Sequence, residues 1–307
     1  MTPERILIVG GSGFIGTALT RELHTHRPGL ALRVMGRSAL PRAPLPAGVE
    51  YLQGDASSRS SVLKALAGVT HVIDLAYATV PKTSFDDPLF DVTANLPASV
   101  NLLQLASQHT LARYLLVSSG GTVYGQSQTL TVNETHPTNP ISPYGISKLL
   151  TEKYGTFFHQ MAGLPLVIAR PANPYGADQI GQIAQGFIGA AIGAARAGRP
   201  LTMYGERGTV RDYVHIDDLV RGLRLCLEQG RAGATYNLGT GIGTDNARVV
   251  DLLRHTSLAA QLQVNHLPER VFDVKRNILD ATLAEREFGW RCAIELNDGL
   301  QQMVDPR

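Results

Sequence analysis

The stretch GGSGFIG, residues 10–16, decides the fold because it stands between an apolar run, RILIVG at 5–10, and a helical pattern. Its glycines at positions Gly10, Gly13 and Gly16 are three apart. Such glycines allow a tight turn, close approach of the backbone to a pyrophosphate and packing of helix on sheet, and the helix amino terminus offers N–H groups to phosphate. The stretch predicts a dinucleotide-binding turn, with a ligand-free glycine turn as the alternative.

Short apolar runs alternate with helical patterns along the first half of the chain. The runs typical of buried strands are 5–10, 30–36, 48–55, 71–76, 112–119 and 164–171. The helical patterns between them are 14–25, 58–67, 93–109 and 143–162. Near-continuous apolar runs are typical of parallel strands covered on both faces. The repeat therefore predicts an α/β fold with a doubly wound parallel sheet of the Rossmann type.

The second half of the chain predicts a smaller carboxyl-terminal substrate lobe that is interleaved with the first domain. We expect the dinucleotide-binding domain to comprise residues 1–175 plus about 206–245. The substrate lobe would then comprise about 176–205 and 246–307.

Composition excludes several classes of partner. The 307 residues carry 28 basic and 26 acidic side chains, a net charge of +2, with no long basic run, so neither nucleic acid nor a membrane surface is expected as a partner. Cys226 and Cys292 are the only cysteines, which excludes a disulfide framework and a cysteine-rich metal site. No apolar stretch approaches the roughly 18 residues of a spanning helix. We expect a cytoplasmic protein with no leader and no metal.

The end of the second predicted strand bears on the choice of cofactor. An acidic residue about 20 positions after the glycines normally holds the adenosine ribose, but this register carries Gly36 and Arg37. A missing acid beside an arginine favours a 2′-phosphate, so NADP is possible; a solvated surface arginine is the alternative. Asp55 could accept a hydrogen bond from adenine, cap the next helix, or do both.

Proton chemistry is indicated by SPYGISK, residues 142–148. Ser142 is a good helix cap and Pro143 suits the first helical position, so Tyr144 and Lys148 fall one turn apart on one face. A cation at about 4 Å contributes roughly 4 kcal/mol at an effective dielectric of 20, equivalent to about three pKa units. Lys148 could thus bring Tyr144 near neutrality as a general base. A core tyrosine followed by a surface lysine is the alternative.

An ordered set of motifs identifies a family resemblance over nearly the whole chain. The set comprises GGSGFIG, GDAS, DLAYA, NLPASVNLLQLA, SSGGTVYG, SPYGISK, ARPANPYG, PLTMYGERGTVRDYVHIDDL, YNLGTG and REFGW. The chain resembles an extended short-chain dehydrogenase/reductase, in the nucleotide-sugar epimerase group typified by UDP-glucose 4-epimerase.

That resemblance implies a tightly held NAD, with Tyr144 as base, Lys148 on the nicotinamide ribose and Asn95 supporting an active-site water network. From the motifs and the resemblance together, the predicted cofactor-binding residues are Gly10, Gly13, Phe14, Ile15, Gly16, Arg37, Asp55, Ala56, Leu75, Ala76, Tyr144 and Lys148. A homodimer is also implied, through helices 93–109 and 143–162.

The resemblance further implies a nucleotide-sugar site in the second lobe. Its implied residues are Asn173 and the arginines Arg211 and Arg270 on the diphosphate, Tyr204 on uracil, Asp273 on ribose, and Asn277 as the gate for the sugar's C2 substituent. Guanidinium forks suit phosphate oxygens, and an aromatic face suits a base. The small Asn277 would leave room for an acetamido group.

One position departs from the family pattern. The family's catalytic hydroxyl stands four residues before the tyrosine of VYG, which here is Gly120. Ser119 is one residue away and Thr122 stands two before Tyr124; we favour Ser119 as the replacement.

The expected reaction is NAD(P)-dependent 4-epimerisation of a UDP-sugar through a transient 4-keto intermediate. A 4,6-dehydratase is less favoured because that group carries Asp-Glu where this chain has Gly121 and Thr122. An NADP-dependent nucleotide-sugar reductase is the main enzymatic alternative. A catalytically silent dinucleotide-binding scaffold or sensor is the alternative from another class.

Overall fold

The main sheet contains seven parallel strands. The computed structural model describes residues 4–177, 186–260, 262–270 and 273–305. Within these, the strands are β1 Arg5–Val9, β2 Ala31–Gly36, β3 Glu50–Gln53, β4 His71–Asp74, β5 Arg113–Val117, β6 Leu166–Pro171 and β10 Thr235–Leu238. Their order is β10-β6-β5-β4-β1-β2-β3, and every neighbouring pair is parallel. The predicted fold class and six predicted strands are confirmed.

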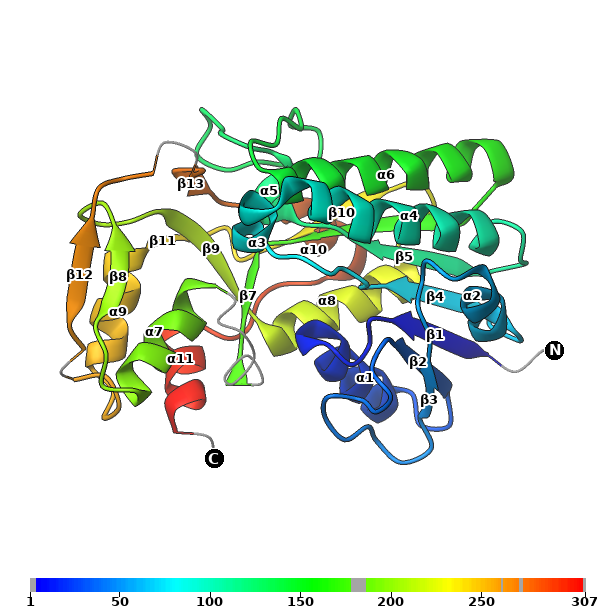
Figure 1. Cartoon of the computed structure of the whole chain (residues 1–307), viewed down its shortest axis with the longest axis horizontal. Helices are drawn as coiled ribbons and strands as arrows, with labels where there is room; N and C mark the ends of the chain where they lie inside the picture. The colour runs from blue at the N-terminus through cyan, green and yellow to red at the C-terminus, as the bar shows by residue number, and fades with distance from the viewer. Residues whose placement is uncertain (1–3, 178–185, 261, 271–272, 306–307) are drawn as a thin grey trace.

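Helices cover both faces of this sheet (Figure 1). The covering helices are α1 Phe14–His26, α2 Arg59–Leu66, α4 Pro88–Ala106, α6 Pro143–Ala162 and α8 Ile216–Gln229, while the short helices α3 Pro81–Asp86 and α5 Gly120–Val123 lie near the start of α6 (Figure 1). Side chains alternate along β1, so Ile6 and Ile8 enter one buried cluster and Leu7 and Val9 the other. Each face therefore has its own hydrophobic core.

A smaller lobe stands at one end of the main sheet (Figure 1). Its strands are β7 Asn173–Tyr175, β8 Leu201–Tyr204, β9 Val210–His215, β11 Gly243–Asp245, β12 Val264–Leu267 and β13 Arg276–Asn277. The four strands β7, β9, β11 and β13 form one sheet, and β8 pairs with β12. The helices α7 Phe187–Arg196, α9 Asn246–Arg254 and α11 Leu296–Val304 pack in this lobe, while α10 Thr282–Phe288 follows β13.

The interleaving of the two lobes is finer than the sequence indicates. The stretch 206–245, expected in the first domain, supplies β10 to the main sheet but β9 and β11 to the smaller one. Residues 178–185 of the expected second lobe lie outside the described residues.

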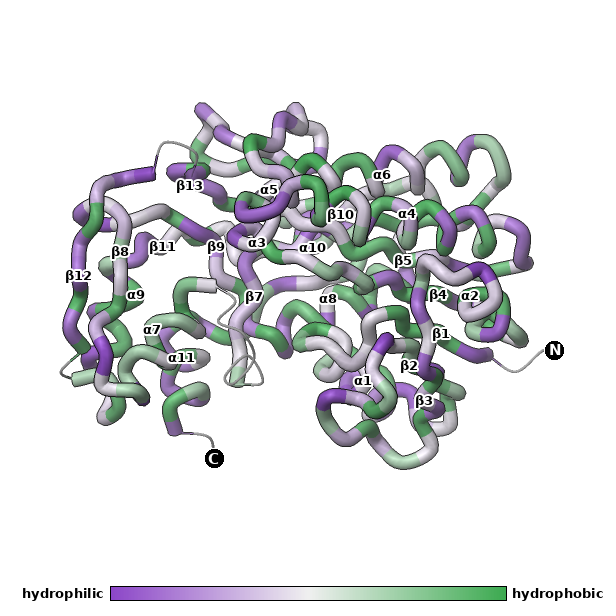
Figure 2. Tube along the Cα trace, in the orientation of Figure 1, coloured by the Kyte–Doolittle hydropathy of each residue, from purple (hydrophilic) through white to green (hydrophobic). Residues whose placement is uncertain are grey.

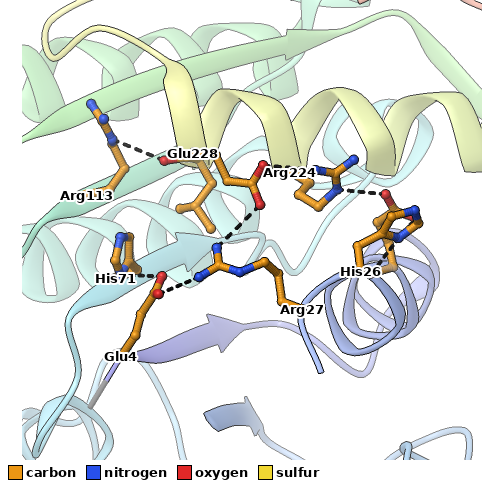
Figure 3. Close-up of polar contacts among 9 residues, drawn as sticks. Glu4, His26, Arg27, His71, Arg113, Arg224 and Glu228 are labelled. Carbon is orange, nitrogen blue, oxygen red and sulfur yellow. Dashed lines mark hydrogen bonds and ion pairs between the residues drawn. The ribbon is translucent and has the colours of Figure 1, made fainter. Parts of the chain in front are cut away.

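An ion-pair cluster links three elements at the end of the main sheet where the strands begin (Figure 3). The Arg27 guanidinium lies 2.6 Å from a Glu4 carboxylate oxygen and 3.5 Å from one of Glu228. Arg224 in turn pairs with Glu228 and Glu22. These pairs connect β1, α1 and α8 at the edge opposite the carboxyl ends of the strands, so they serve the fold and not the site described below.

Two further structural findings concern only the described part of the chain. No helix there combines the length and the apolar character needed to span a bilayer. No group of three or more His, Cys, Asp or Glu side chains there could hold a metal ion.

Candidate active site

A single continuous cavity of about 850 Å³ connects the two lobes. It begins at the glycine turn, passes Tyr144 and Lys148, and reaches Arg211 and Arg270 in the smaller lobe. The glycine turn lies where the strand order reverses, between β1 and its neighbours β2 and β4. In doubly wound sheets, ligands bind at this switch point, beyond the carboxyl ends of the strands. The size is at the upper end for small-molecule sites.

The glycine turn is packed so closely against its own backbone and the end of β4 that a side chain at Gly10 or Gly16 would clash. Gly10 has φ +79°, and a Cβ there would lie 2.9 Å from the Ala76 nitrogen. A Cβ on Gly16 would lie 2.5 Å from the Gly11 Cα. The α1 helix begins at Phe14, and its N-cap Gly13 supplies no side-chain cap, so the first N–H groups face the turn. This cradle fits the pyrophosphate of a dinucleotide.

Every residue predicted to bind the cofactor lines this cavity. The set is Gly10, Gly13, Phe14, Ile15, Gly16, Arg37, Asp55, Ala56, Leu75, Ala76, Tyr144 and Lys148. Their contacts with a bound cofactor remain a prediction.

Tyr144 and Lys148 stand in the first two turns of α6, where the sequence places them. The Ser142 side chain accepts the Gly145 N–H at 3.1 Å and caps the helix. Lys148 is buried, and its Nζ donates to the Val117 carbonyl at 3.1 Å. The Nζ lies 5.9 Å from the Tyr144 ring centroid.

The expected effect of Lys148 on Tyr144 is wrong for this structure. Burial raises the pKa of Tyr144, and only the hydrogen bond with Ser119 opposes that rise. The charge of Lys148 is not among the causes of this shift, and its ammonium lies 5.9 Å from the centre of the tyrosine ring. Burial also lowers the pKa of Lys148 to about 8, against the opposing effects of Asp74 and Glu152. The chain alone therefore does not bring Tyr144 to neutrality.

A buried polar network that the sequence reasoning missed supports the two catalytic candidates. Asp91, fully buried on α4, accepts hydrogen bonds from Thr79 and from Ser147, the latter at 2.6 Å. Asn95 donates to the Thr79 Oγ1 at 3.0 Å and accepts the Ala78 N–H at 2.7 Å. The Asn95 carboxamide thus holds the loop after β4, and because the residue also lines the cavity, its support of an active-site water network stays a prediction.

Asp74 is a second buried carboxylate that was missed. It ends β4, accepts a hydrogen bond from the Tyr114 hydroxyl at 2.9 Å, and helps to keep Lys148 charged. Burial raises the pKa of Asp74. Its signal in the sequence was an acid at the end of an otherwise apolar run, in DLAYA.

The loop SSGGT places two hydroxyls in the cavity. Ser119 and Thr122 both line it. Ser119 is the hydroxyl that hydrogen-bonds Tyr144, whereas the Thr122 Oγ1 is directed at the Ser119 carbonyl, 3.5 Å away. The geometry supports Ser119 as the substitute for the missing hydroxyl.

A side chain at Gly120 would clash unless its neighbours shift. A Cβ there would lie 2.5 Å from the Leu279 Cδ1 and 2.9 Å from the Arg170 carbonyl oxygen. By contrast, the nearest atom to a Cβ on Gly121 is 3.5 Å away. The departure at Gly120 therefore follows from packing against the segment after β13.

Asn277 lies in that same packing layer, which corrects its predicted role. The side chain is 3% exposed and donates to the Gly120 carbonyl at 3.0 Å. It is not part of the cavity lining. Asn277 therefore supports the loop at Gly120, and the expected tolerance of acetamido sugars loses its basis in this residue.

Two guanidinium groups stand at the far end of the cavity. Arg211 donates to the Val274 carbonyl at 2.7 Å, and Arg270 pairs with Asp273 at 2.9 Å. Burial lowers the pKa of Arg211, and nearby Arg270 adds to that effect. Asn173 also lines the cavity, held by a hydrogen bond to the Asp212 carbonyl. This end suits an anion such as a diphosphate.

Tyr204 stands behind this pair and outside the cavity lining. The Arg270 guanidinium lies 4.0 Å from its ring centroid, so Arg270 covers one face of the ring. The predicted stacking of Tyr204 on a base would have to use the remaining surface of the ring.

Acidic side chains are scarce along the cavity. Among the described lining residues, the only carboxylates are Asp55, at the glycine-turn end, and Asp273, paired with Arg270. The described residues that line the cavity around Tyr144 and Ser119 therefore offer hydroxyls, amides and an ammonium, but no carboxylate.

Comparisons with known proteins agree with this geometry. A model of the NAD dependent epimerase/dehydratase family matches residues 6–239. A dTDP-glucose 4,6-dehydratase of Streptomyces griseus is 30% identical over 97% of this chain and 92% of its own length. A UDP-glucose 4-epimerase of Thermotoga maritima, solved with UDP-glucose, is 29% identical with a TM-score of 0.91, covering 98% of this chain and 97% of that one. The UDP-glucose 4-epimerase of Thermus thermophilus, solved with NAD, is 30% identical with a TM-score of 0.89 and covers 98% of each chain.

Proposed function

Since the chain belongs to the NAD-dependent epimerase/dehydratase family, a group of extended short-chain dehydrogenases/reductases, we propose that it is a UDP-sugar 4-epimerase. In this proposal the hydroxyl at C4 of the sugar is oxidised to a ketone. The 4-keto sugar then rotates in the site, and reduction on the opposite face of the carbonyl yields the epimer. The absence of a carboxylate from the described lining near Tyr144 carries the choice of epimerase over dehydratase.

That absence matters because the two reactions need different proton chemistry. Elimination of water from C5 and C6 needs a general acid and a general base within reach of those atoms. The positions where dehydratases carry Asp-Glu hold Gly121 and Thr122, and no other acid of the described lining stands nearby. Epimerisation needs one group that takes the proton from the C4 hydroxyl and returns it to the C4 oxygen.

The residues of this chain divide the work as follows. Tyr144 takes the proton from the C4 hydroxyl, and Ser119 hydrogen-bonds the phenol. Lys148, held on the Val117 carbonyl, stands beside them as a buried cation. NAD, when bound, accepts and returns the hydride, and its oxidised ring adds a positive charge that favours the phenolate. Arg211 and Arg270 hold the diphosphate.

We also propose that the chain forms a homodimer through α4 and α6. The α6 face opposite Lys148 exposes an apolar stripe whose spacing is that of one helical face: Ile146, Leu150, Tyr154, Phe157 and Met161. Leu89, Phe90 and Val92 are also exposed at the start of α4, which lies beside α6 (Figure 1), and Phe90 in addition lines the cavity. Figure 2 shows hydrophobic segments along both helices. A second copy of the same stripe would cover it symmetrically.

The purified protein tests the proposed reaction directly. We expect UDP-glucose and UDP-galactose to interconvert without added reductant and without net change in nicotinamide absorbance. dTDP-glucose serves as the comparison substrate. A 4-keto-6-deoxy product would show a dehydratase, and stoichiometric consumption of NAD(P)H would show a reductase; either result overturns the proposal.

A further inference from the structure

The adenosine end of the cavity differs from an NAD site in its charges. In such sites a carboxylate at the end of the second strand accepts hydrogen bonds from the ribose hydroxyls. Here β2 ends at Gly36, and the lining continues with Arg37, Ser38 and Arg42. Arg42 lies five positions beyond Arg37, and only the fold shows that both reach the same cavity.

The space for a carboxylate at position 36 is already filled. A Cβ on Gly36 would lie 2.8 Å from the Tyr51 hydroxyl and 3.0 Å from the Ser12 Oγ. The Tyr51 hydroxyl is itself held, because it donates to the Ser38 carbonyl at 2.7 Å. Position 36 therefore requires a glycine, because a side chain there would clash with Tyr51 and Ser12.

Asp55, the remaining acid at this end, faces its own loop. Its Oδ1 accepts the Ser57 N–H at 2.8 Å and the Ser57 hydroxyl at 2.7 Å. These bonds hold the pKa of Asp55 below its usual value, and the positive charge of Arg37 contributes to the same shift. Asp55 thus stays an anion turned onto Ser57.

The two arginines keep their donors available. Arg37 and Arg42 are exposed, and neither guanidinium donates a hydrogen bond or forms an ion pair within the described part of the chain. Each presents a planar fork of N–H donors, which matches phosphate oxygens better than a ribose hydroxyl. Two guanidinium groups line one pocket, and a carboxylate at position 36 is excluded by its neighbours. This arrangement suits a doubly charged anion.

We propose that this end of the cavity is a subsite for a 2′-phosphate, so that the chain binds NADP at least as tightly as NAD. Arg37 and Arg42 contact the phosphate, and Tyr51 and Ser12 keep the position of the usual carboxylate closed. The inference concerns the cofactor half of the cavity alone and holds whichever sugar is turned over.

Binding of two small probes tests the subsite without any catalysis. Adenosine 2′,5′-bisphosphate and 5′-AMP differ only by the 2′-phosphate, and calorimetric titration of each into the full chain, freed of bound nucleotide, yields the ratio of their Kd values. We expect the bisphosphate to bind roughly ten-fold more tightly or better, since hydrogen bonds to charged groups contribute that much or more. Arg37→Ala and Arg42→Ala should each lower this preference by about five- to ten-fold.

Two controls make the result decisive. Arg199→Ala removes an exposed arginine that lies outside the cavity lining and should leave the ratio unchanged. An unaltered Kd for 5′-AMP shows that each variant is folded. Equal affinities of the wild type for the two probes overturn the proposal, as does a preference that survives both arginine substitutions. Sugar turnover is not measured in this experiment, so a failure here leaves the proposed epimerase activity standing.

Discussion

The ring of Tyr77 lies edge to face against the ring of Tyr144, with centroids 5.0 Å apart and planes at 74°. The same ring carries the Lys148 ammonium 4.0 Å from its centroid. Tyr77, on the loop after β4, thus contacts both members of the Tyr-Lys pair, and its ring lies closer to the ammonium than the Tyr144 ring does, at 4.0 Å against 5.9 Å.

This contact predicts a role for Tyr77 in keeping Lys148 charged. A desolvated cation–π contact is worth about 2 kcal/mol, or about 1.5 pKa units. Losing this contact lowers the pKa of Lys148. Activity that needs the ammonium then begins to fall at a lower pH than in the wild type. We expect Tyr77→Leu to move the alkaline limb of kcat/KM down by about one unit. Tyr77→Phe, which keeps the ring, is the control, and coincident limbs in the Leu variant and wild type contradict the role.

Tyr144→Phe should abolish turnover while sparing ligand binding. The phenol is the group proposed to move the proton of the C4 hydroxyl, and such groups contribute about 10²- to 10⁴-fold. The ring and its contact with Tyr77 remain in Phe. We expect kcat to fall by that factor, with UDP affinity in equilibrium titration unchanged. Turnover at the wild-type rate would remove Tyr144 from the mechanism.

Substitutions of Ser119 and Thr122 should have clearly different effects on kcat. Because Ser119 hydrogen-bonds the phenol and Thr122 is directed at a backbone carbonyl, only Ser119→Ala should slow the reaction strongly. A hydrogen bond to a charged group is worth about 1.5 to 3 kcal/mol, which corresponds to about a ten- to 150-fold loss in kcat. Thr122→Val is the matched variant. A larger loss in the Thr122 variant reverses the assignment.

Two adjacent glycines provide a test of packing at the departure from the family pattern. Gly120→Ala forces a Cβ against Leu279 and the Arg170 carbonyl, so it should lower the free energy of unfolding by about 1 to 3 kcal/mol. Gly121→Ala meets only ordinary contacts and should change it by less than about 1 kcal/mol, because alanine also favours the helix. Urea unfolding of both variants measures this. Equal free energies of unfolding for the two variants would contradict the packing argument, because they would mean that the residues around Asn277 shift at little cost.

The exposed stripe on α6 predicts a dimer that a single charge disrupts. Phe157 is 51% exposed in the chain alone, and a glutamate there would be buried unpaired in the dimer. We expect wild type to sediment with twice the mass of one chain and Phe157→Glu with the mass of one. Leu130→Glu, at an equally apolar exposed position outside α4 and α6, should stay dimeric. A monomeric wild type at micromolar concentration ends the proposal.

Much of the fold was predictable because its signals are local. Apolar runs long enough for a buried strand, followed by capped helical patterns, recur from β1 to β6, and the observed bounds differ from the predicted ones by a few residues. The glycine turn and the α6 cap also act within one or two turns of chain. Their neighbours along the sequence are therefore enough to predict them.

The errors at the site come from contacts between distant segments. Asn277 was placed in the pocket by counting from Arg270, but pairing of β13 with β9 turns it toward Gly120. The predicted lowering of the Tyr144 pKa considers Lys148 alone, whereas burial dominates that pKa. The supporting carboxylates were missed because Asp91 and Ser147 are 56 positions apart in the chain.

By itself, the sequence determined the parallel sheet, the glycine cradle at its switch point and the placement of Tyr144 one turn before Lys148, because periodicity, capping and glycine spacing operate over a few residues. Only the tertiary structure shows which groups lie together. The Lys148 ammonium lies closest to the Tyr77 ring, and Arg42 lines the same cavity as Arg37. A side chain at Gly120 would clash with Leu279 and the Arg170 carbonyl. Burial, charge and steric contact depend on elements packed from distant parts of the chain, and only the folded arrangement brings them together.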